Sequence, residues 1–442
     1  MKGLSEELLK RYAQAFKADP VNAMRMNAVV KNGLSDAAEN QQEYIDNPMT
    51  FSIELESGKI TNQKSSGRCW LFAGLNTMRY EIMQKCNLET FELSQNYAMF
   101  FDKLEKSNYF LESILNTLDE PLEGRLIAHL LTAPIQDGGQ WDMFCALVDK
   151  YGCVPKSVMP ETFQSSNSNM MNKYITLKLR EYAMQLRDAA KAGKGMDELE
   201  QMKEQMMGEV YGMLCICLGQ PPQTFTWEYR DKDKNFHREE NLTPKAFFDK
   251  FVGQKLDEFI SIINAPTADK PYNRTYTVAY LGNVCEGRQI KYLNLTSEEQ
   301  KQLAIKQLED GHPVWFGCDV GQFLTRDSGI MGMKNFGMEQ LLGVKFGMDK
   351  AQRLDYHESV LTHAMVFLGV NLVNGKPNRW KVENSWSDKS GQDGYYLMTD
   401  EWFDEFNYQV VINKKYLTDE QRKAFEQEPI VLKPWDPMGS LA

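Results

Sequence analysis

The sequence predicts an α+β protein that is helical in its first part and β-rich in its last, with a large helical insertion between the two. Apolar residues recur at helical spacing over 5–32 and again over 69–86. Residues 169–218 repeat this spacing on both sides of "KAGKG", which predicts a helical hairpin. Short apolar runs then crowd the end of the chain, namely "PVWFGCDV", "HAMVFLGV", "RWKVENSW", "GYYLMTD" and "YQVVINKKY".

Three further elements follow from local signals. "FSIELES" at 51–57 alternates apolar and polar residues, as a half-buried strand does. "TFTWEYRDKDKNF" at 224–236 predicts a β-hairpin with a charged turn. Thr296 followed by Glu299 is a capping box, which predicts a helix over 297–310.

Composition restricts the class of protein. The 442 residues are 42% hydrophobic and 25% charged, which is typical of a folded chain with a large core. The net charge of −11 disfavours general nucleic-acid binding, because phosphate backbones are repelled. The eight cysteines form no CxxC pair, and the chain starts without the apolar segment of a secretory signal. We therefore expect free thiols in the cytoplasm, no membrane span and no metal site.

The stretch "NQKSSGRCW" carries the first candidate for chemistry. It places Gln63 and Cys69 on either side of a small, flexible run, and Cys69 stands at the start of the predicted helix 69–86. The partial positive charge of a helix N-terminus favours a thiolate, so Cys69 is a candidate nucleophile. The alternative is an inert thiol, since free cysteine is among the most buried residue types.

A cysteine nucleophile needs an imidazole and a third group that orients it. Of five histidines, His363 begins the predicted strand "HAMVFLGV", whereas His129 lies in an apolar helical stretch and is expected in the core. Asn384 follows His363 by 21 positions in "VENSW". Its amide could accept a hydrogen bond from the imidazole, with Trp386 shielding that bond from water.

These motifs resemble the papain-like cysteine proteases. "NQKSSGRCWLFA", "LSQNYAMFFDKLEKSN", "DGGQWDM", "YGCVPKS", "THAMVFLGV" and "VENSW" are, in this order, similar to the group of bleomycin hydrolase and bacterial aminopeptidase C. His363 follows Cys69 by 294 positions, against about 130–150 in simple papain-like members. The helical insertion accounts for the excess. Residues 65–68, "SSGR", replace the usual Cys-Gly before the nucleophile.

The resemblance implies a papain-like fold with a helical lobe, a β-barrel-like lobe, a large helical insertion and a C-terminal arm. We divide the chain accordingly into an N-terminal helical or hook segment (1–60), the helical lobe with the nucleophile (61–160), a mainly helical insertion (161–300), the β lobe with His and Asn (301–428) and an arm in the active-site cleft (429–442).

The resemblance also implies roles for the candidate residues. Cys69 attacks the substrate, His363 acts as base and then as acid, and Asn384 orients the imidazole. Gln63 would donate to the oxyanion together with the Cys69 backbone N–H. Gly138 and Gly139 are either a simple turn or a place where a substrate backbone lies close, and the second interpretation is preferred. The reaction requires no cofactor and no metal.

The C-terminal segment "EPIVLKPWDPMGSLA" is too rich in proline for a helix and too apolar for a solvated tail. The resemblance implies that it lies in the cleft, with the Ala442 carboxylate facing a substrate ammonium. The expected function is a cytoplasmic cysteine aminopeptidase that acts on peptides with a free N-terminus and forms a homohexamer. Two alternatives stay open: an open-cleft endopeptidase, and a nucleic-acid-binding or scaffold protein on an inactive protease fold.

Overall fold

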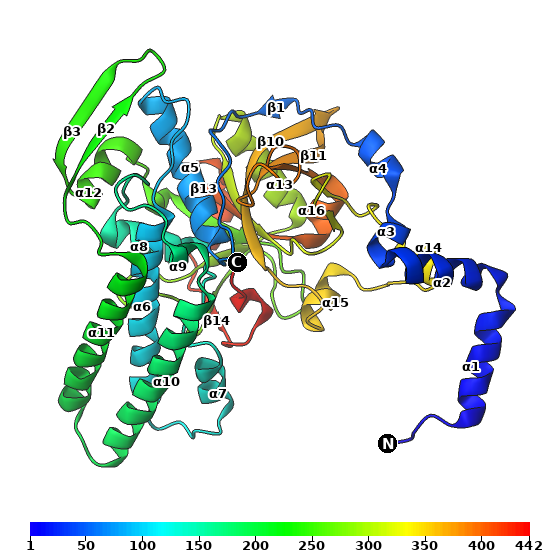
Figure 1. Ribbon diagram of the computed structural model, residues 1–442, viewed down its shortest axis with the longest axis horizontal. Coiled ribbons are helices and arrows are strands. Elements are labelled where there is room, and N and C mark those ends of the chain that lie inside the picture. The colour runs from blue at the N-terminus through cyan, green and yellow to red at the C-terminus, as the bar shows by residue number, and fades with distance from the viewer.

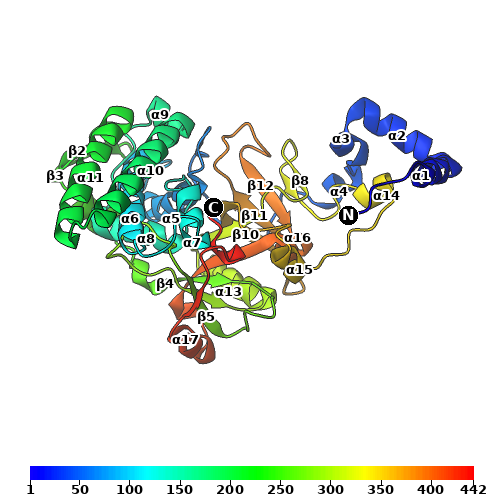
Figure 2. The same cartoon turned by 90° about the horizontal axis from the view of Figure 1, so that it is seen from below.

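The computed structural model describes residues 1–442 and consists of an N-terminal arm, a helical half and a half built around a large sheet (Figure 1). The helical half and the arm lie on opposite sides of the sheet, and a quarter turn of the molecule gives the same arrangement (Figure 2). The C-terminus lies in both views where the helical half meets the sheet.

The N-terminal arm contains two helices where one was predicted. α1 (Glu6–Ala18) ends where Asp19 caps α2 (Pro20–Asn32), and Pro20 takes the first helical position, which suits its fixed φ. No residue of α1 or α2 is buried. The apolar side of α1, with Leu9, Tyr12 and Phe16, is therefore exposed within a single chain.

The helical half is built around α5 (Cys69–Lys85), which confirms the helix predicted over 69–86. This helix is buried on almost every side over its first three turns, so it forms the centre of the molecule. The predicted helical hairpin is also confirmed, as α10 (Asn169–Lys191) and α11 (Met196–Leu218), which lie side by side against α6 (Gln95–Leu115) (Figure 1). The hairpin of β2 (Phe225–Arg230) and β3 (Phe236–Leu242) is as expected.

The sheet places the second half of the site. β7 (Val314–Cys318) and β10 (His363–Val373) are antiparallel neighbours, and His363 stands opposite Cys318. β11 (Lys376–Glu383) lies on the other side of β10 and ends one residue before Asn384. α13 (Ser297–Glu309) begins at the predicted capping box of Thr296 and Glu299.

The strands differ from the sequence prediction in two places. The segment 161–300 contains the long helices α10 and α11, but its last part also contributes strands: β4 (Phe259–Ile263), β5 (Arg274–Val278) and β6 (Tyr292–Asn294) join the same sheet as β7 and β10. β4 reads "FISII" and is buried along its whole length, so it shows no alternation. The strand expected over 51–57 is only β1 (Ile53–Glu54), paired with β10.

The remaining elements complete the two halves. The other helices are α3 (Leu34–Ala38), α4 (Gln41–Asp46), α7 (Arg125–Thr132), α8 (Trp141–Tyr151), α9 (Phe163–Ser166), α12 (Pro244–Phe247), α14 (Met338–Leu342), α15 (Lys350–Asp355), α16 (Asp400–Phe406) and α17 (Asp419–Phe425). The other strands are β8 (Leu324–Thr325), β9 (Ile330–Met331), β12 (Tyr395–Thr399), β13 (Asn407–Asn413) and β14 (Ile430–Leu432). None of the helices combines the length and the apolarity needed to cross a membrane.

Candidate active site

Cys69 is the first residue of α5 and is almost fully buried. Burial raises the pKa of the Cys69 thiol to about 11, and the backbone N–H groups of Ala364 and Trp70 oppose that rise. The contact with the Ala364 backbone places the thiol beside the start of β10, where His363 is the residue before Ala364. The structure thus brings together two residues that are 294 positions apart in the sequence.

His363, Asn384 and Trp386 form the second part of the site. Asn384 Oδ1 accepts a hydrogen bond from His363 Nε2 at 2.9 Å and another from the Ser385 backbone N–H at 2.7 Å. The Trp386 ring lies 4.9 Å from the His363 ring and shields this contact, as expected from the sequence. Because Nε2 is occupied by the amide, Nδ1 is the ring nitrogen left for the thiol.

The state of the thiol and the imidazole depends on burial. Burial lowers the pKa of His363 to about 4, although the hydrogen bond to Asn384 acts in the opposite direction. Burial therefore favours a neutral thiol and a neutral imidazole in this closed arrangement. Moving the proton from Cys69 to His363 creates no net charge, so the ion pair gains its stability from mutual attraction and from the N-terminus of α5.

Gln63 is held in place by four hydrogen bonds, one of them from the Ser66 hydroxyl to the Gln63 carbonyl at 2.7 Å. Its Nε2 donates to the Ser66 carbonyl at 2.8 Å, and its Oε1 accepts from the Ser385 hydroxyl at 2.6 Å. Its backbone N–H donates to the Ser385 carbonyl at 2.8 Å. An amide nitrogen carries two hydrogens, so one remains for a substrate oxygen. The side chain is buried and fixed in advance, which is what an oxyanion donor requires.

The glycine pair touches the end of the chain. A Cβ on Gly138 would come within 2.7 Å of a carboxylate oxygen of Ala442, and one on Gly139 within 2.4 Å of the Trp70 ring. Gly139 N–H donates to a carboxylate oxygen of Ala442 at 3.2 Å, and Ala442 N–H donates to the Gly139 carbonyl at 3.3 Å. Both positions need glycine because the arm on one side and Trp70 on the other leave no room for a side chain.

The arm is bonded to both halves of the molecule. Gln140 Nε2, from the helical half, donates to the Ser440 carbonyl at 2.6 Å. Ser440 Oγ donates to the Leu361 carbonyl at 2.6 Å, two residues before His363. Farther back, Asp436 forms an ion pair with Lys270 at 2.9 Å. The last residues therefore lie between the two halves (Figure 1), bonded to the residue after Gly138 and to a residue two positions before His363.

Several residues near the site were missed or misplaced from the sequence. Lys106 Nζ donates to the Gly138 carbonyl at 2.6 Å, and the Asp137 carboxylate accepts hydrogen bonds from several segments at once. The only sequence signal for Asp137 is its place directly before the two glycines. His129 was expected in the core, which is wrong: Ile127 and Leu130 fill the buried face of α7, and His129 is exposed.

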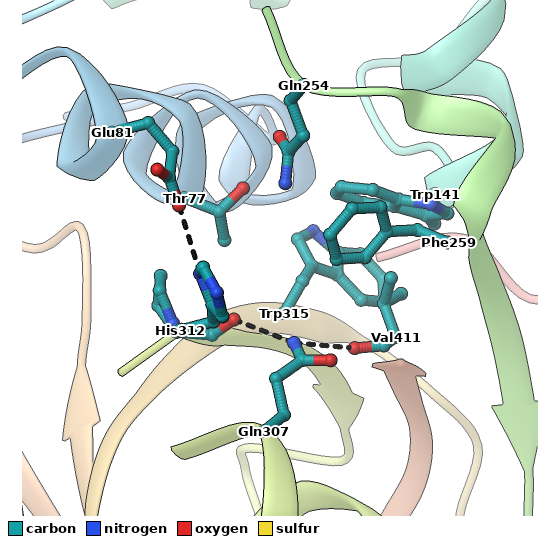
Figure 3. A pocket seen from close by; sticks show the side chains of 10 residues that line it. Thr77, Glu81, Trp141, Gln254, Phe259, Gln307, His312, Trp315 and Val411 are labelled. Atoms are coloured by element: carbon teal, nitrogen blue, oxygen red, sulfur yellow. Dashed lines mark hydrogen bonds and ion pairs between the residues drawn. The ribbon is translucent and has the colours of Figure 1, made fainter. Parts of the chain in front are cut away.

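A small pocket lies between side chains of α5, β4 and β7 (Figure 3). It has an apolar wall of Trp141, Trp315 and Phe259, faced by polar side chains that include His312 and Gln254. Its volume is about 10 Å³, the lower limit of the space that one water molecule needs. None of the predicted site residues lines it, so this pocket is separate from the candidate active site.

The site combines a buried thiol at a helix start, an imidazole on a strand and an amide that orients the imidazole. It lies between a helical half and a sheet. This arrangement is that of a papain-like cysteine peptidase. The model of the Peptidase C1-like family matches residues 3–439. The chain belongs to this family. The predicted fold class and the predicted resemblance to the group of bleomycin hydrolase and aminopeptidase C are thereby confirmed.

Three relatives illustrate the similarity. Aminopeptidase C of Listeria monocytogenes serovar 1/2a is 49% identical over 439 residues, which is 99% of both chains. Bleomycin hydrolase of Gallus gallus is 40% identical over 450 residues, covering 100% of this chain and 99% of its own. The crystal structure of PepW from Lactobacillus rhamnosis HN001 is 51% identical and superimposes with a TM-score of 0.99, covering 100% of this chain and 99% of that one.

Proposed function

We propose that Cys69, His363 and Asn384 carry the reaction of this cysteine aminopeptidase, which removes single residues from the N-termini of peptides. The observation that carries the proposal is the pair of hydrogen bonds between Gly139 and Ala442, at 3.2 and 3.3 Å, because it puts the end of the chain where a substrate backbone would run. The relatives named aminopeptidase C support the same activity.

The reaction follows from the side chains present. Cys69 gives its proton to His363 Nδ1, and the sulfur attacks the carbonyl carbon of the first peptide bond. The resulting oxyanion accepts hydrogen bonds from the Cys69 backbone N–H and from Gln63 Nε2. His363 returns the proton to the leaving amine as the C–N bond breaks, which leaves the first residue attached to Cys69 as a thioester.

Hydrolysis of the thioester completes the cycle. His363 takes a proton from water while the water oxygen attacks the thioester carbonyl, and the C–S bond breaks. The proton then returns to the sulfur, so the enzyme is regenerated and a free amino acid leaves. Asn384 keeps the imidazole in one orientation through both steps, because its oxygen holds Nε2.

The arm sets where a substrate starts. Ala442 occupies the position beside Gly139, so only one substrate residue fits between the arm and the sulfur of Cys69. The α-ammonium of that residue would face the Ala442 carboxylate, a charge-assisted contact that contributes roughly 1.5–3 kcal/mol. Most of the preference for a free N-terminus therefore comes from steric exclusion by the arm.

The arm and the charge also weigh against the alternatives. An endopeptidase needs an extended channel on both sides of the nucleophile, and residues 440–442 fill one side. A nucleic-acid-binding role is disfavoured by the net charge of −11. The eight free cysteines suit the reducing cytoplasm, which we propose as the location.

We also propose that the protein is a homo-oligomer, and the resemblance implies a hexamer. α1 exposes Leu9, Tyr12 and Phe16 on one side and contributes no buried residue to its own chain. An amphipathic helix gains its stability by burying its apolar face, so a second copy is the expected cover. Light scattering of the full chain, compared with a chain that lacks residues 1–32, tests this proposal; a monomeric full chain would contradict it.

The test of the activity uses matched peptides with free and acetylated N-termini. We expect stepwise release of the N-terminal residue from the free peptide and nearly none from the acetylated one. Cys69→Ala supplies the blank and should release nothing from either peptide. Equal cleavage of the two peptides would favour an endopeptidase, and activity in Cys69→Ala would remove the proposed nucleophile.

A further inference from the structure

The carboxylate of Asp137 lies where four segments meet: its own loop, the loop before Cys69, α6 and the start of α10. Oδ1 accepts hydrogen bonds from Lys103 Nζ at 2.6 Å and from Asn172 Nδ2 at 2.7 Å. Oδ2 accepts from the Gly67 backbone N–H at 2.9 Å and from the Ser168 hydroxyl. Burial alone would raise the pKa of Asp137, but the Lys103 ammonium and these donors hold it well below its usual range. The group is therefore a carboxylate with four partners.

Two of these segments line the proposed site. Gly67 lies between Gln63 and Cys69, the two residues proposed to hold the oxyanion, and Asp137 directly precedes Gly138 and Gly139. The Asp137 carbonyl accepts from Trp70 Nε1 at 2.7 Å, which adds a second link to the start of α5. A Cβ on Gly67 would come within 2.9 Å of the Asp137 Cβ, so the two loops touch closely.

Another of these segments is the start of α10, which contains none of the proposed site residues. Ser168 is the N-cap residue of α10, a position where serine normally bonds the backbone of its own helix. Here the Ser168 side chain accepts no cap hydrogen bond, and its hydroxyl donates to Asp137. The N-cap residue of α10 is therefore linked to the loop that precedes the glycine pair.

A second carboxylate links the same region of the insertion to the nucleophile loop. Arg68 donates two hydrogen bonds to Glu161, at 2.9 and 2.7 Å, and Ser165 Oγ donates to the same carboxylate at 2.8 Å. The Ser65 backbone N–H donates to the Ser166 carbonyl at 3.0 Å. Residues 161–172 therefore support the whole segment that leads to Cys69.

We propose that Asp137 is a positioning residue through which the start of α10, by Ser168 and Asn172, fixes the oxyanion loop and the glycine pair in their catalytic geometry. The inference rests on the proposed roles of Cys69 and Gln63. It gives the helical insertion a part in the chemical step as well as in the architecture, since a misplacement of about 1 Å in the site can cost about 10²-fold in rate.

The test changes only the outer partners. The double variant Ser168→Ala/Asn172→Ala removes two donors to Asp137 and leaves the residues of the site in place, and Asn172→Ala alone is a milder form. Gln185→Ala is the matched control, because this amide lies on the same helix and bonds only Glu181. We measure kcat and KM with an aminoacyl substrate, thermal unfolding, and inhibition by an aminoacyl aldehyde and by the corresponding alcohol.

The two inhibitors separate positioning from general damage. The aldehyde adds the thiol and forms an oxyanion, whereas the alcohol occupies the same site without one. We expect kcat of the double variant to fall about tenfold or more with KM changed less than about twofold. The aldehyde should lose affinity by the same factor as kcat while the alcohol keeps its affinity. Asn172→Ala should show a smaller change in the same direction, and Gln185→Ala none.

Other outcomes overturn the proposal. Unchanged kcat in a folded double variant would show that α10 does not position the loop. If the aldehyde and the alcohol lose affinity equally, the substitutions have damaged the site in general. If the double variant does not fold, Asn172→Ala supplies the same comparison of the two inhibitors. If the wild-type enzyme binds the aldehyde no better than the alcohol, the assignment of Cys69 as the nucleophile is refuted. This result would be a failure of the proposed function, and it differs from a failure of the positioning role, which only the variants reveal.

Discussion

Removal of the last three residues, Ser440 to Ala442, should convert the aminopeptidase into an enzyme that also accepts blocked peptides. The cut after Gly439 is chosen because Met438 is buried and the Gly439 N–H closes a turn on the Asp436 carbonyl, at 2.8 Å. The part of the arm outside the cleft, including the ion pair of Asp436 with Lys270, should therefore keep its place. The catalytic residues are not altered.

The size of the effect follows from the hydrogen bonds that the truncation removes. Residues 440–442 make four of them in the cleft: two with Gly139, one with Gln140 and one with Leu361. At about 0.5–1.5 kcal/mol each, these stabilise the closed cleft by about 2–6 kcal/mol. A blocked peptide must displace them from wild-type enzyme, so truncation should raise its kcat/KM by at least about 30-fold, the factor that corresponds to 2 kcal/mol.

The assay compares kcat/KM for free and acetylated forms of one peptide in wild-type and truncated enzyme. Activity on the free peptide should fall, because the carboxylate that faces its ammonium is gone. One residue added after Ala442 should inhibit both reactions by crowding the site, which serves as the opposite perturbation. A truncated enzyme that still requires a free N-terminus would refute the reasoning, and an acidic side chain would then have to hold the ammonium.

Three more predictions concern the centre of the site. Gln63→Ala should lower kcat by about 10²–10³-fold, the effect of removing one oxyanion donor. Ser385→Ala is the control, because it removes only the hydroxyl bonded to Gln63 Oε1. An equal loss of kcat in both variants would assign the effect to the position of the loop that carries Gln63. The pKa of His363 is lowered to about 4 in the folded protein, from 6.5 in the unfolded chain. Between these two pH values the unfolded chain binds a proton that the folded protein does not. The free energy of unfolding should therefore fall by about 3 kcal/mol as the pH drops from 6.5 to 4. Urea unfolding measured across this pH range gives the free energy of unfolding at each pH, and His363→Gln should lack this part of its pH dependence. If the wild-type protein lacks it too, the imidazole is already charged in the folded protein. Arg79→Ala should destabilise the fold by about 3–5 kcal/mol, because it leaves Glu383 buried without its ion pair at 2.8 Å; a change under about 1 kcal/mol in thermal unfolding would contradict this.

Sequence reasoning worked where the signal is local. Cys69 stands at a helix start and His363 at a strand start, and both positions follow from apolar spacing and from short motifs. The helix over 69–86, the hairpin of α10 and α11 and the capping box at Thr296 were predicted for the same reason. The fold class followed from the order of these elements and from the resemblance.

Features that depend on distant contacts were not predictable in this way. β4 reads as an apolar run without period, because it is buried on both faces, so its place in the sheet was missed. Ser168 looks like an ordinary helix cap, and only the fold shows its hydroxyl on Asp137, 31 positions away. His129 was misplaced because the apolar stretch of α7 has a second, exposed side that carries it.

The covalent intermediate tests the central claim most directly. The enzyme is mixed with a peptide whose N-terminus is free, quenched in acid within one turnover and mapped by mass spectrometry. Cys69 should then carry the first residue of that peptide as a thioester. The added mass should equal one residue and no more, because the arm leaves room for one. An adduct on another cysteine, such as the exposed Cys285, or an adduct of several residues on Cys69, would contradict the account.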